Sequence, residues 1–166
     1  MADPALVRLP TTLGTPRVSA LLRAASREDL PAIVALLAAD QMGATRESPE
    51  DVGAYLAAFE AVDRDPAHLL LAAESAGQVV GTLQLSFLPG LARRGAWRAQ
   101  IEAVRVADGH RNAGLGQAMI TWAVEEAGRR GCALVQLTSD KRRTEAHRFY
   151  ARLGFAASHE GFKLAL

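Results

Sequence analysis

The stretch Val104-Arg105-Val106-Ala107-Asp108-Gly109-His110-Arg111-Asn112-Ala113-Gly114-Leu115-Gly116 joins an apolar run to a short polar loop with three glycines and an arginine. The residues that follow, 117–124, have the apolar spacing of a helix. The first turn of a helix leaves backbone N–H groups unpaired, and the helix dipole favours negative charge there. Glycine lets the backbone approach a phosphate closely because it has no Cβ. The stretch therefore predicts an anion site between a strand and a helix, with the rest of the chain as its scaffold.

Composition limits the class of protein. The chain has 166 residues, of which 49% are hydrophobic and 22% charged, so it is long enough for one globular domain with a core. A formal net charge of +1 argues against nucleic acid as the main partner. The single cysteine, Cys132, excludes an internal disulfide and favours a cytoplasmic location. No apolar run is long enough to span a membrane, and the N-terminus lacks the apolar core of a secretion signal.

Periodicity predicts the order of the elements around the loop. Residues 1–18 contain three prolines and little periodicity, so they are interpreted as a flexible N-terminal tail, or an added edge segment, before a single domain over 19–166. Apolar spacing predicts strands at 20–25, 68–74, 79–87, 100–106 and 133–138, with final strands within 155–166. It predicts helices at 27–39, 50–62, 114–130 and 143–153. The strands from 68 to 106 form an antiparallel meander, and the crossover at 114–130 makes its flanking strands parallel.

Two common phosphate-binding patterns do not fit the loop. A P-loop has a lysine and a hydroxyl residue after its last glycine, whereas Gly116 is followed by Gln117 and Ala118. A dinucleotide fingerprint needs a further glycine or alanine where this chain has Met119, and it follows a βαβ unit rather than a meander. The loop therefore belongs to neither class.

The surviving pattern, Arg111-x-x-Gly114-x-Gly116, is similar to the pyrophosphate loop of the GNAT superfamily of acyl-CoA-dependent N-acetyltransferases. The segment 146–155 resembles that family's Ala-x-x-hydrophobic-Tyr-x-x-x-Gly-Phe signature, and residues 22–30 resemble its first strand and helix entry. The resemblance covers residues 20–166. It implies an α/β fold of the α+β mixed-sheet kind, with about six to seven strands flanked by about four helices and splayed at the cofactor strand.

The resemblance also implies acetyl-CoA as co-substrate and no metal. Backbone N–H groups of the loop would hold the pyrophosphate, from Arg111, Asn112, Ala113, Gly114, Leu115 and Gly116. Backbone groups of Val104 and Val106 would meet the pantetheine arm, and an oxyanion donor would lie near Val104. Many family members have a pantetheine-binding asparagine where this chain has Arg143. We therefore expect Arg143, in the cationic run Lys141-Arg142-Arg143, to reach a cofactor phosphate instead.

Two residues are candidates for proton transfer. The family places a tyrosine beside the cofactor sulfur, which makes Tyr150 the expected general acid; the alternative is a core tyrosine on the apolar stripe of its helix. Glu102 precedes Val104 by two residues, where several family members carry a glutamate that acts directly or through water. Partial burial on the strand would make it a stronger base. Otherwise Glu102 is a solvent-facing residue, or an anchor for the substrate amine.

The expected activity is direct transfer of acetyl from acetyl-CoA to a primary amine in a ternary complex. The acceptor, a small molecule or a peptide, is expected between residues 41–62 and the loop Leu88–Arg98, with acidic side chains of Glu47, Glu50 and Asp51 attracting a cationic amine. The alternative is a catalytically silent acyl-CoA sensor or regulatory module. Neither nucleic acid nor membrane is an expected partner, and a homodimer is common in the family.

Overall fold

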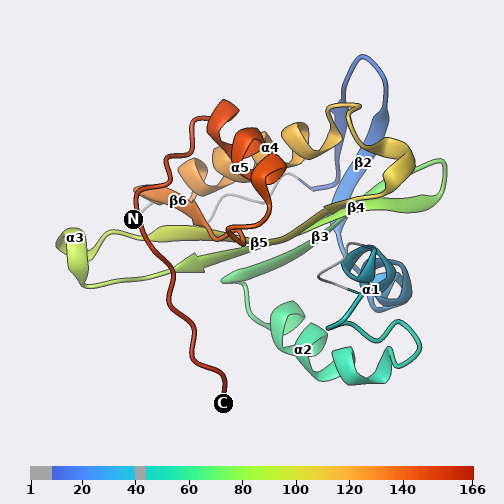
Figure 1. The fold of residues 1–166 in the computed structure, drawn as a ribbon, viewed down its shortest axis with the longest axis horizontal. Helices are drawn as coiled ribbons and strands as arrows, with labels where there is room; N and C mark the ends of the chain where they lie inside the picture. Colours follow the sequence, from blue (N-terminus) through green and yellow to red (C-terminus); the bar gives the residue numbers. More distant parts are fainter. Residues whose placement is uncertain (1–8, 40–43) are drawn as a thin grey trace.

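The computed structural model describes residues 9–39 and 44–166, which fold around one six-stranded mixed sheet (Figure 1). The strands lie in chain order across the sheet. Neighbouring strands are antiparallel except β5 and β6, which are parallel. The strands are β1 Thr11–Gly14, β2 Ser19–Ala24, β3 His68–Ser75, β4 Gln78–Leu88, β5 Arg98–Val106 and β6 Leu134–Leu137. The predicted mixed sheet and its meander are confirmed.

Helices cover both faces of this sheet (Figure 1). They are α1 Leu30–Ala38, α2 Gly53–Arg64, α3 Ala92–Gly95, α4 Leu115–Arg129 and α5 Thr144–Arg152, with 3₁₀ turns η1 Arg27–Asp29 and η2 Asp108–His110. Helices α1 and α2 lie on one face and α4 and α5 on the other, while α3 sits at the tip of the β4–β5 hairpin. No helix in the described ranges is long and apolar enough to cross a membrane.

The main core lies between the sheet and α4. The helix buries an apolar stripe that includes Leu115, Met119 and Ala123, because these positions recur at helical spacing. Alternate strand residues such as Leu83 and Ile101 meet this stripe from the sheet. On the opposite face a smaller cluster forms under α1, whereas α2 buries no residue at all. The face under α2 is therefore only loosely covered.

The two ends of the chain compare differently with the expectations. Residues 11–14 form the edge strand β1, in line with the alternative of an added edge segment, and Leu13 packs into the main core with 8% of its surface exposed. Residues 1–8 lie outside the described ranges. The prediction of final strands within 155–166 is wrong, since this segment contains no strand and residues 156–166 are all exposed. No neighbouring strand within the described chain stabilises this segment.

Strand β5 separates from β6 halfway along its length. The two strands pair from Arg98 to Ile101, where β6 ends at Leu137, and β5 continues to Val106. On its other side β5 carries a bulge, since Ala103 adopts a left-handed φ of 54° where the β4–β5 register shifts. This is the predicted splay, and it leaves one edge of β5 open beyond Ile101.

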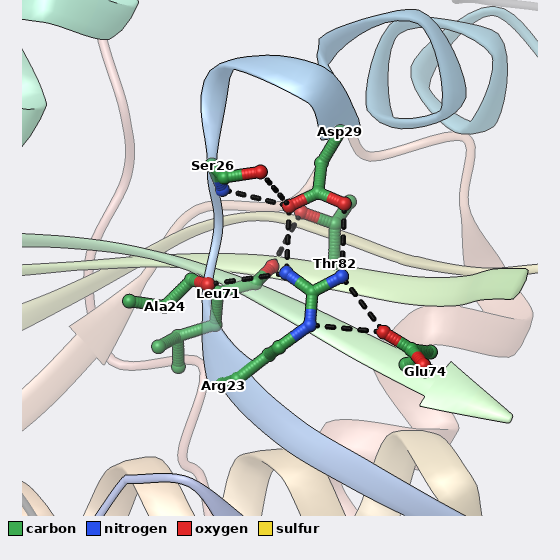
Figure 2. A network of polar contacts seen from close by, with 7 residues as sticks. All are labelled: Arg23, Ala24, Ser26, Asp29, Leu71, Glu74 and Thr82. Atoms are coloured by element: carbon green, nitrogen blue, oxygen red, sulfur yellow. Dashed lines mark hydrogen bonds and ion pairs between the residues drawn. The ribbon is translucent and has the colours of Figure 1, made fainter. Parts of the chain in front are cut away.

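A partly buried ion-pair network connects the first elements of the fold (Figure 2). Arg23 on β2 donates two hydrogen bonds to Asp29, at 2.7 and 2.9 Å, and two to Glu74 on β3, at 3.0 and 2.8 Å. Asp29 also accepts the backbone N–H of Ser26 at 2.7 Å, which caps the helix entry. The network ties β2, β3 and the start of α1 together.

Replacing Asp29 with asparagine is expected to lower the free energy of unfolding by about 2 kcal/mol at neutral pH, because Arg23 loses its charged partner. The Arg23 guanidinium lowers the pKa of the Asp29 carboxyl from 3.8 to about 2. A carboxyl with a depressed folded-state pKa stabilises the fold above its unfolded pKa. We therefore expect the wild type to lose this contribution, about 1–2 kcal/mol, between pH 4 and pH 2.

Urea unfolding across this pH range measures both effects. The matched control is Glu60→Gln, which removes an exposed i,i+4 ion pair with Arg64 and is expected to change the free energy of unfolding by less than about 0.5 kcal/mol. Equal stabilities of Asp29→Asn and the control would contradict the assignment.

Candidate active site

The predicted anion loop follows β5 as η2 and residues 111–114, and it enters α4. Gly114 is the N-cap of α4 with a left-handed φ of 88°, and Asn112 has a φ of 59°, which asparagine tolerates better than most residues. A Cβ on Gly116 would lie 3.6 Å from Val106 and 3.7 Å from Phe149. The first turn of α4 is therefore pressed between β5 and α5, and its N–H groups lack intrahelical acceptors.

A turn far away in sequence braces this loop. Thr15, between β1 and β2, donates its hydroxyl to the carbonyl of Ala113 at 2.7 Å, and its side chain lies 3.4 Å from where a Cβ on Gly114 would stand. Arg17 reaches the carbonyl of Asn112 at 3.5 Å. The sequence pattern had no signal for this brace, because Thr15 and Ala113 are 98 residues apart.

Replacing Thr15 with valine is expected to weaken CoA binding about 5- to 10-fold, since the loop loses one hydrogen bond and the turn loses the hydroxyl that organises it. Isothermal titration with CoA measures the change. Thr12→Val is the matched control, because Thr12 is exposed on β1 and should leave the affinity unchanged. Wild-type affinity in Thr15→Val would show that the loop holds its shape without the brace.

The side chain of Arg111 supports the loop rather than extending from it. Its Nε donates to the carbonyl of Val106 at 3.2 Å, and its guanidinium pairs with Asp108 at 2.9 Å. Arg111 is thus tied to the end of β5, which leaves the backbone of the loop to face a ligand. Among the predicted site residues, the structure brings Arg111 and Gly116 of the loop against Val106 at the end of β5.

Tyr150 lies on α5 beside this open edge. Its ring makes edge-to-face contacts with Phe149 at 5.2 Å and Phe155 at 5.9 Å between centroids. Burial raises the pKa of the Tyr150 phenol, and the nearby cations Arg143 and Arg105 partly oppose this rise. Since Arg105 belongs to β5 and Arg143 begins α5, the phenol sits between these two elements and stays protonated at neutral pH.

Glu102 occupies the opposite face of the sheet, toward α1 and α2. Ala99 and Ile101 alternate with Gln100 and Glu102 along β5, and they are buried in the core that includes α4. Glu102 therefore points to the other face of the sheet. Of the two alternatives for Glu102, the structure shows the solvent-facing one, because the side chain is exposed. The physical reason is the loose cover of α2, which buries none of its residues. Glu102 faces Gln84 of β4 across the ladder.

A row of polar side chains crosses the same face next to Glu102. His68, Ser86, Gln100 and Gln136 are in register on β3, β4, β5 and β6. The His68 ring nitrogen Nδ1 and the Ser86 hydroxyl are 2.8 Å apart, and Gln136 Nε2 donates to Gln100 Oε1 at 2.7 Å. An antiparallel sheet often has one polar face where it is not packed on the core. This polar row, which the sequence analysis did not identify, is a candidate binding surface because α2 covers the face only loosely.

Two connections border this surface. In one, the Tyr55 hydroxyl accepts the backbone N–H of Ser48 at 2.8 Å and donates to Glu47 at 3.0 Å, so Glu47 is already engaged. In the other, Asp140 pairs with Arg142 at 3.0 Å, and this cation, together with Arg46, holds the pKa of the Asp140 carboxyl well below its usual range. Arg46, which precedes α2, is thus near Asp140, which follows β6.

The cationic run before α5 is partly neutralised. Lys141 pairs with Glu160 at 2.7 Å and Arg142 with Asp140, whereas Arg143 forms the N-cap of α5 near Tyr150. Cys132 is half-buried and its pKa is raised by burial, so it is not an activated nucleophile. Among residues 9–39 and 44–166 no group of three or more His, Cys, Asp or Glu could hold a metal ion.

Comparisons with known proteins agree with this geometry. Residues 30–155 match the family described as "Acetyltransferase (GNAT) family". The chain is 33% identical over 146 residues to an aminoalkylphosphonate N-acetyltransferase of Salmonella typhimurium, covering 87% of this chain and 90% of that one. It is 36% identical over 90 residues to a glucosamine 6-phosphate N-acetyltransferase of Trypanosoma brucei brucei, covering 54% and 59%. A crystal structure described as a transcriptional regulator from Bacillus halodurans superposes with a TM-score of 0.85, at 42% identity over 89% of this chain and 99% of that one.

The splayed mixed sheet, the glycine loop at a helix N-terminus and the comparisons all agree on one family. The chain belongs to the acetyltransferase (GNAT) family. Its relatives and its fold assign it as an N-acetyltransferase.

Proposed function

We propose that the protein transfers an acetyl group from acetyl-CoA to the primary amine of a small acceptor by direct attack in a ternary complex. The observation that carries this proposal is the position of Tyr150. Its phenol is half-buried on α5 near Arg105 of β5 and Arg143, and its neighbour Phe149 packs against the first turn of α4 at Gly116. A cofactor whose pyrophosphate binds the loop and whose arm follows β5 would bring its sulfur to this phenol.

The residues at the splay fit a pantetheine arm. Beyond Ile101 the edge of β5 has no partner on β6, which supports pairing of the pantetheine amides with backbone groups of Val104 and Val106. The carbonyls of these two residues also accept hydrogen bonds from the side chains of Arg105 and Arg111. The hydroxyl of Ser139, just after β6, is buried and has no hydrogen-bond partner among the described residues. A buried polar atom of this kind calls for a ligand group. Arg143, beside Tyr150, supplies positive charge for a cofactor phosphate.

Acetyl-CoA supplies an activated thioester, and the chain supplies proton transfer and orientation. In the proposed step the acceptor nitrogen bonds to the thioester carbon and the C–S bond breaks. Glu102, directly or through water, takes the ammonium proton, and the Tyr150 hydroxyl gives its proton to the sulfur. The backbone N–H near Val104 stabilises the oxyanion that forms in between.

We further propose that the acceptor carries a phosphonate or phosphate as well as its amine. Arg98, Gln100 and Glu102 alternate along β5 on the face that carries the polar row, with the cation at one end and the carboxylate at the other. The Arg98 guanidinium borders the β4–β5 connection, since its Nη1 is 3.1 Å from where a Cβ on Gly90 would stand. The two relatives named above are described as acting on an aminoalkylphosphonate and on glucosamine 6-phosphate, and both acceptors combine an amine with a phosphorus oxyanion.

Thiol release from acetyl-CoA, measured with paired acceptors, tests the activity. The pairs are an aminoalkylphosphonate against the plain alkylamine, and glucosamine 6-phosphate against glucosamine. We expect release with the phosphorylated or phosphonylated member of at least one pair and much less with its partner. Tight CoA binding without amine-dependent release from any acceptor would favour the silent sensor. Equal rates within both pairs would refute the proposed anionic group on the acceptor, but they would not refute acetyl transfer itself.

Replacing Arg98 with glutamine is expected to raise the acceptor KM about 10-fold or more for the anionic acceptor, because a charge-assisted contact is lost. The KM for acetyl-CoA and the rate with an uncharged amine should stay near wild type. Steady-state kinetics with Arg94→Gln provide the matched control, since Arg94 is an exposed cation on α3. Equal acceptor KM values in the two variants would place the anion site elsewhere.

A further inference from the structure

The polar row lies between the two charged residues that the proposed function assigns to the acceptor. Arg98, Gln100 and Glu102 alternate along β5, so their side chains share one face of the sheet. Gln100 is the β5 member of the polar row, and the other members are in register with it on β3, β4 and β6. An acceptor that reaches from the cation to the carboxylate must therefore cross the polar row.

The distance between the two charged positions bears on the length of the acceptor. Arg98 and Glu102 are four residues apart on one strand, which places their Cα atoms about 13 Å from each other. The Arg98 guanidinium does not shorten this span, because its Nη1 lies 3.1 Å from where a Cβ on Gly90 would stand. Gly90 follows the end of β4 that pairs with Arg98, on the side away from Glu102. This span favours an acceptor whose amine and anionic group are several bonds apart.

The polar row consists of two hydrogen-bonded pairs that differ in exposure. Ser86 is buried, with 4% of its surface exposed, and its hydroxyl is satisfied by His68 Nδ1 at 2.8 Å. In the other pair, Gln136 Nε2 donates to Gln100 Oε1 at 2.7 Å in an exposed position. Among the described residues, neither the N–H groups of the Gln100 amide nor the carbonyl of Gln136 has a hydrogen-bond partner. This glutamine pair is therefore the part of the polar row that is open to a ligand.

The open atoms of the glutamine pair match hydroxyl groups. Gln100 Nε2 offers N–H donors, and Gln136 Oε1 offers an acceptor on the neighbouring strand, about 4.8 Å away. A hydroxyl both donates and accepts, so one hydroxyl or two neighbouring ones can pair with both amides. A methylene chain laid over the same atoms would displace their water without replacing the hydrogen bonds, which costs affinity. The glutamine pair thus distinguishes a hydroxylated acceptor from a plain alkyl one.

We propose that Gln100 and Gln136 bind hydroxyl groups of the acceptor, between its anionic group and its amine. The acceptor is then a polyhydroxylated amino phosphate, of about the size of an amino sugar phosphate, rather than a short aminoalkyl compound. This inference rests on the proposed function, which places the acceptor on the same face of the sheet. It adds the chemistry of the part of the acceptor that joins the two charged ends.

Two acceptors of matched length test this assignment. Glucosamine 6-phosphate and 5-aminopentyl phosphate have the same carbon count between nitrogen and phosphate, but only the first carries hydroxyl groups. Isothermal titration of each into the protein, in the presence of CoA, measures binding without acetyl transfer. We expect the wild type to bind glucosamine 6-phosphate at least about 10-fold more tightly, because the matched alkyl phosphate leaves both amides without partners.

Substitutions in the glutamine pair are expected to remove this preference. Gln100→Leu and Gln136→Leu, on separate strands, should each weaken binding of glucosamine 6-phosphate about 10-fold and change that of 5-aminopentyl phosphate by less than about 2-fold. Unchanged circular dichroism verifies that each variant is folded. Gln78→Leu is the matched control, since Gln78 is exposed at the start of β4 and should keep the preference.

The outcomes separate this inference from the proposed activity. Equal wild-type affinity for the two acceptors, binding of neither, or equal losses for both acceptors in the glutamine variants would overturn the hydroxyl assignment. Thiol release from acetyl-CoA with any amine would leave the activity standing in each of these cases. Preferential binding of glucosamine 6-phosphate that depends on the glutamine pair, without thiol release, would support the assignment and contradict the activity.

Discussion

Replacing Tyr150 with phenylalanine is expected to lower kcat roughly 100-fold or more while the KM for acetyl-CoA changes little. The phenol is the proposed proton donor to the leaving thiolate, and general acids contribute about 100- to 10,000-fold in other enzymes. Phenylalanine keeps the ring and its contacts with Phe149 and Phe155, so the fold of α5 should survive. Steady-state kinetics with a good acceptor, followed across pH, measure the effect.

The pH profile distinguishes catalysis from packing. Burial raises the pKa of Tyr150 above its ordinary value of 10.0, and the group is active while protonated. An alkaline decline in the wild-type kcat due to Tyr150 therefore lies above pH 10, and this decline should be absent from Tyr150→Phe. The matched control is Tyr55→Phe, which alters the only other tyrosine and should leave kcat within a few-fold. A Tyr150→Phe enzyme with wild-type kcat at every pH would remove Tyr150 as the acid.

Replacing Gly116 with glutamate is expected to weaken CoA binding by at least about 100-fold, beyond what the loss of a single contact explains. The Cβ of the new side chain would be in van der Waals contact with Val106 and Phe149, at 3.6 and 3.7 Å, which leaves little room on that side for the rest of the glutamate. Its carboxylate would then occupy an anion site at the N-terminus of α4 and repel the pyrophosphate. Isothermal titration with CoA measures the loss.

A glycine-to-glutamate substitution elsewhere on α4 tests whether the loss of CoA binding depends on the position of residue 116. Gly128 lies near the other end of this helix, and a Cβ there would meet nothing within 4 Å. Gly128→Glu is expected to bind CoA with wild-type affinity, at a small cost from the helix dipole. If both glutamate variants lost binding equally, a general disturbance of α4 would replace the specific explanation.

The local sequence pattern was sufficient to predict those helices and strands whose formation depends mainly on their own residues. Helical spacing gave α4, and alternation gave β3, β4 and β5, since each forms from short-range periodicity around a strong apolar face. The glycine loop was recognisable because its requirements are local. Gly114 needs a left-handed φ, and Gly116 faces a close approach to Val106.

Long-range register was not available from the sequence. The polar row from His68 to Gln136 exists only because four strands align in one register. The exposure of Glu102 depends on how little α2 covers, which its apolar spacing does not reveal. The prediction of final strands within 155–166 failed, because a strand needs a neighbour in the sheet and the described chain provides none for this segment.

The hydrogen bond from the Thr15 hydroxyl to the carbonyl of Ala113 couples the conformation of the glycine loop to that of the β1–β2 hairpin. Any ligand that holds the loop in its bound shape must also favour the docked β1–β2 turn, by the reciprocity of linked equilibria. At a concentration 100 times its dissociation constant, a cofactor selective for the folded state adds about 2.7 kcal/mol to stability. Binding of the proposed cofactor at the loop is therefore expected to stabilise β1, the outermost strand at the edge away from β6.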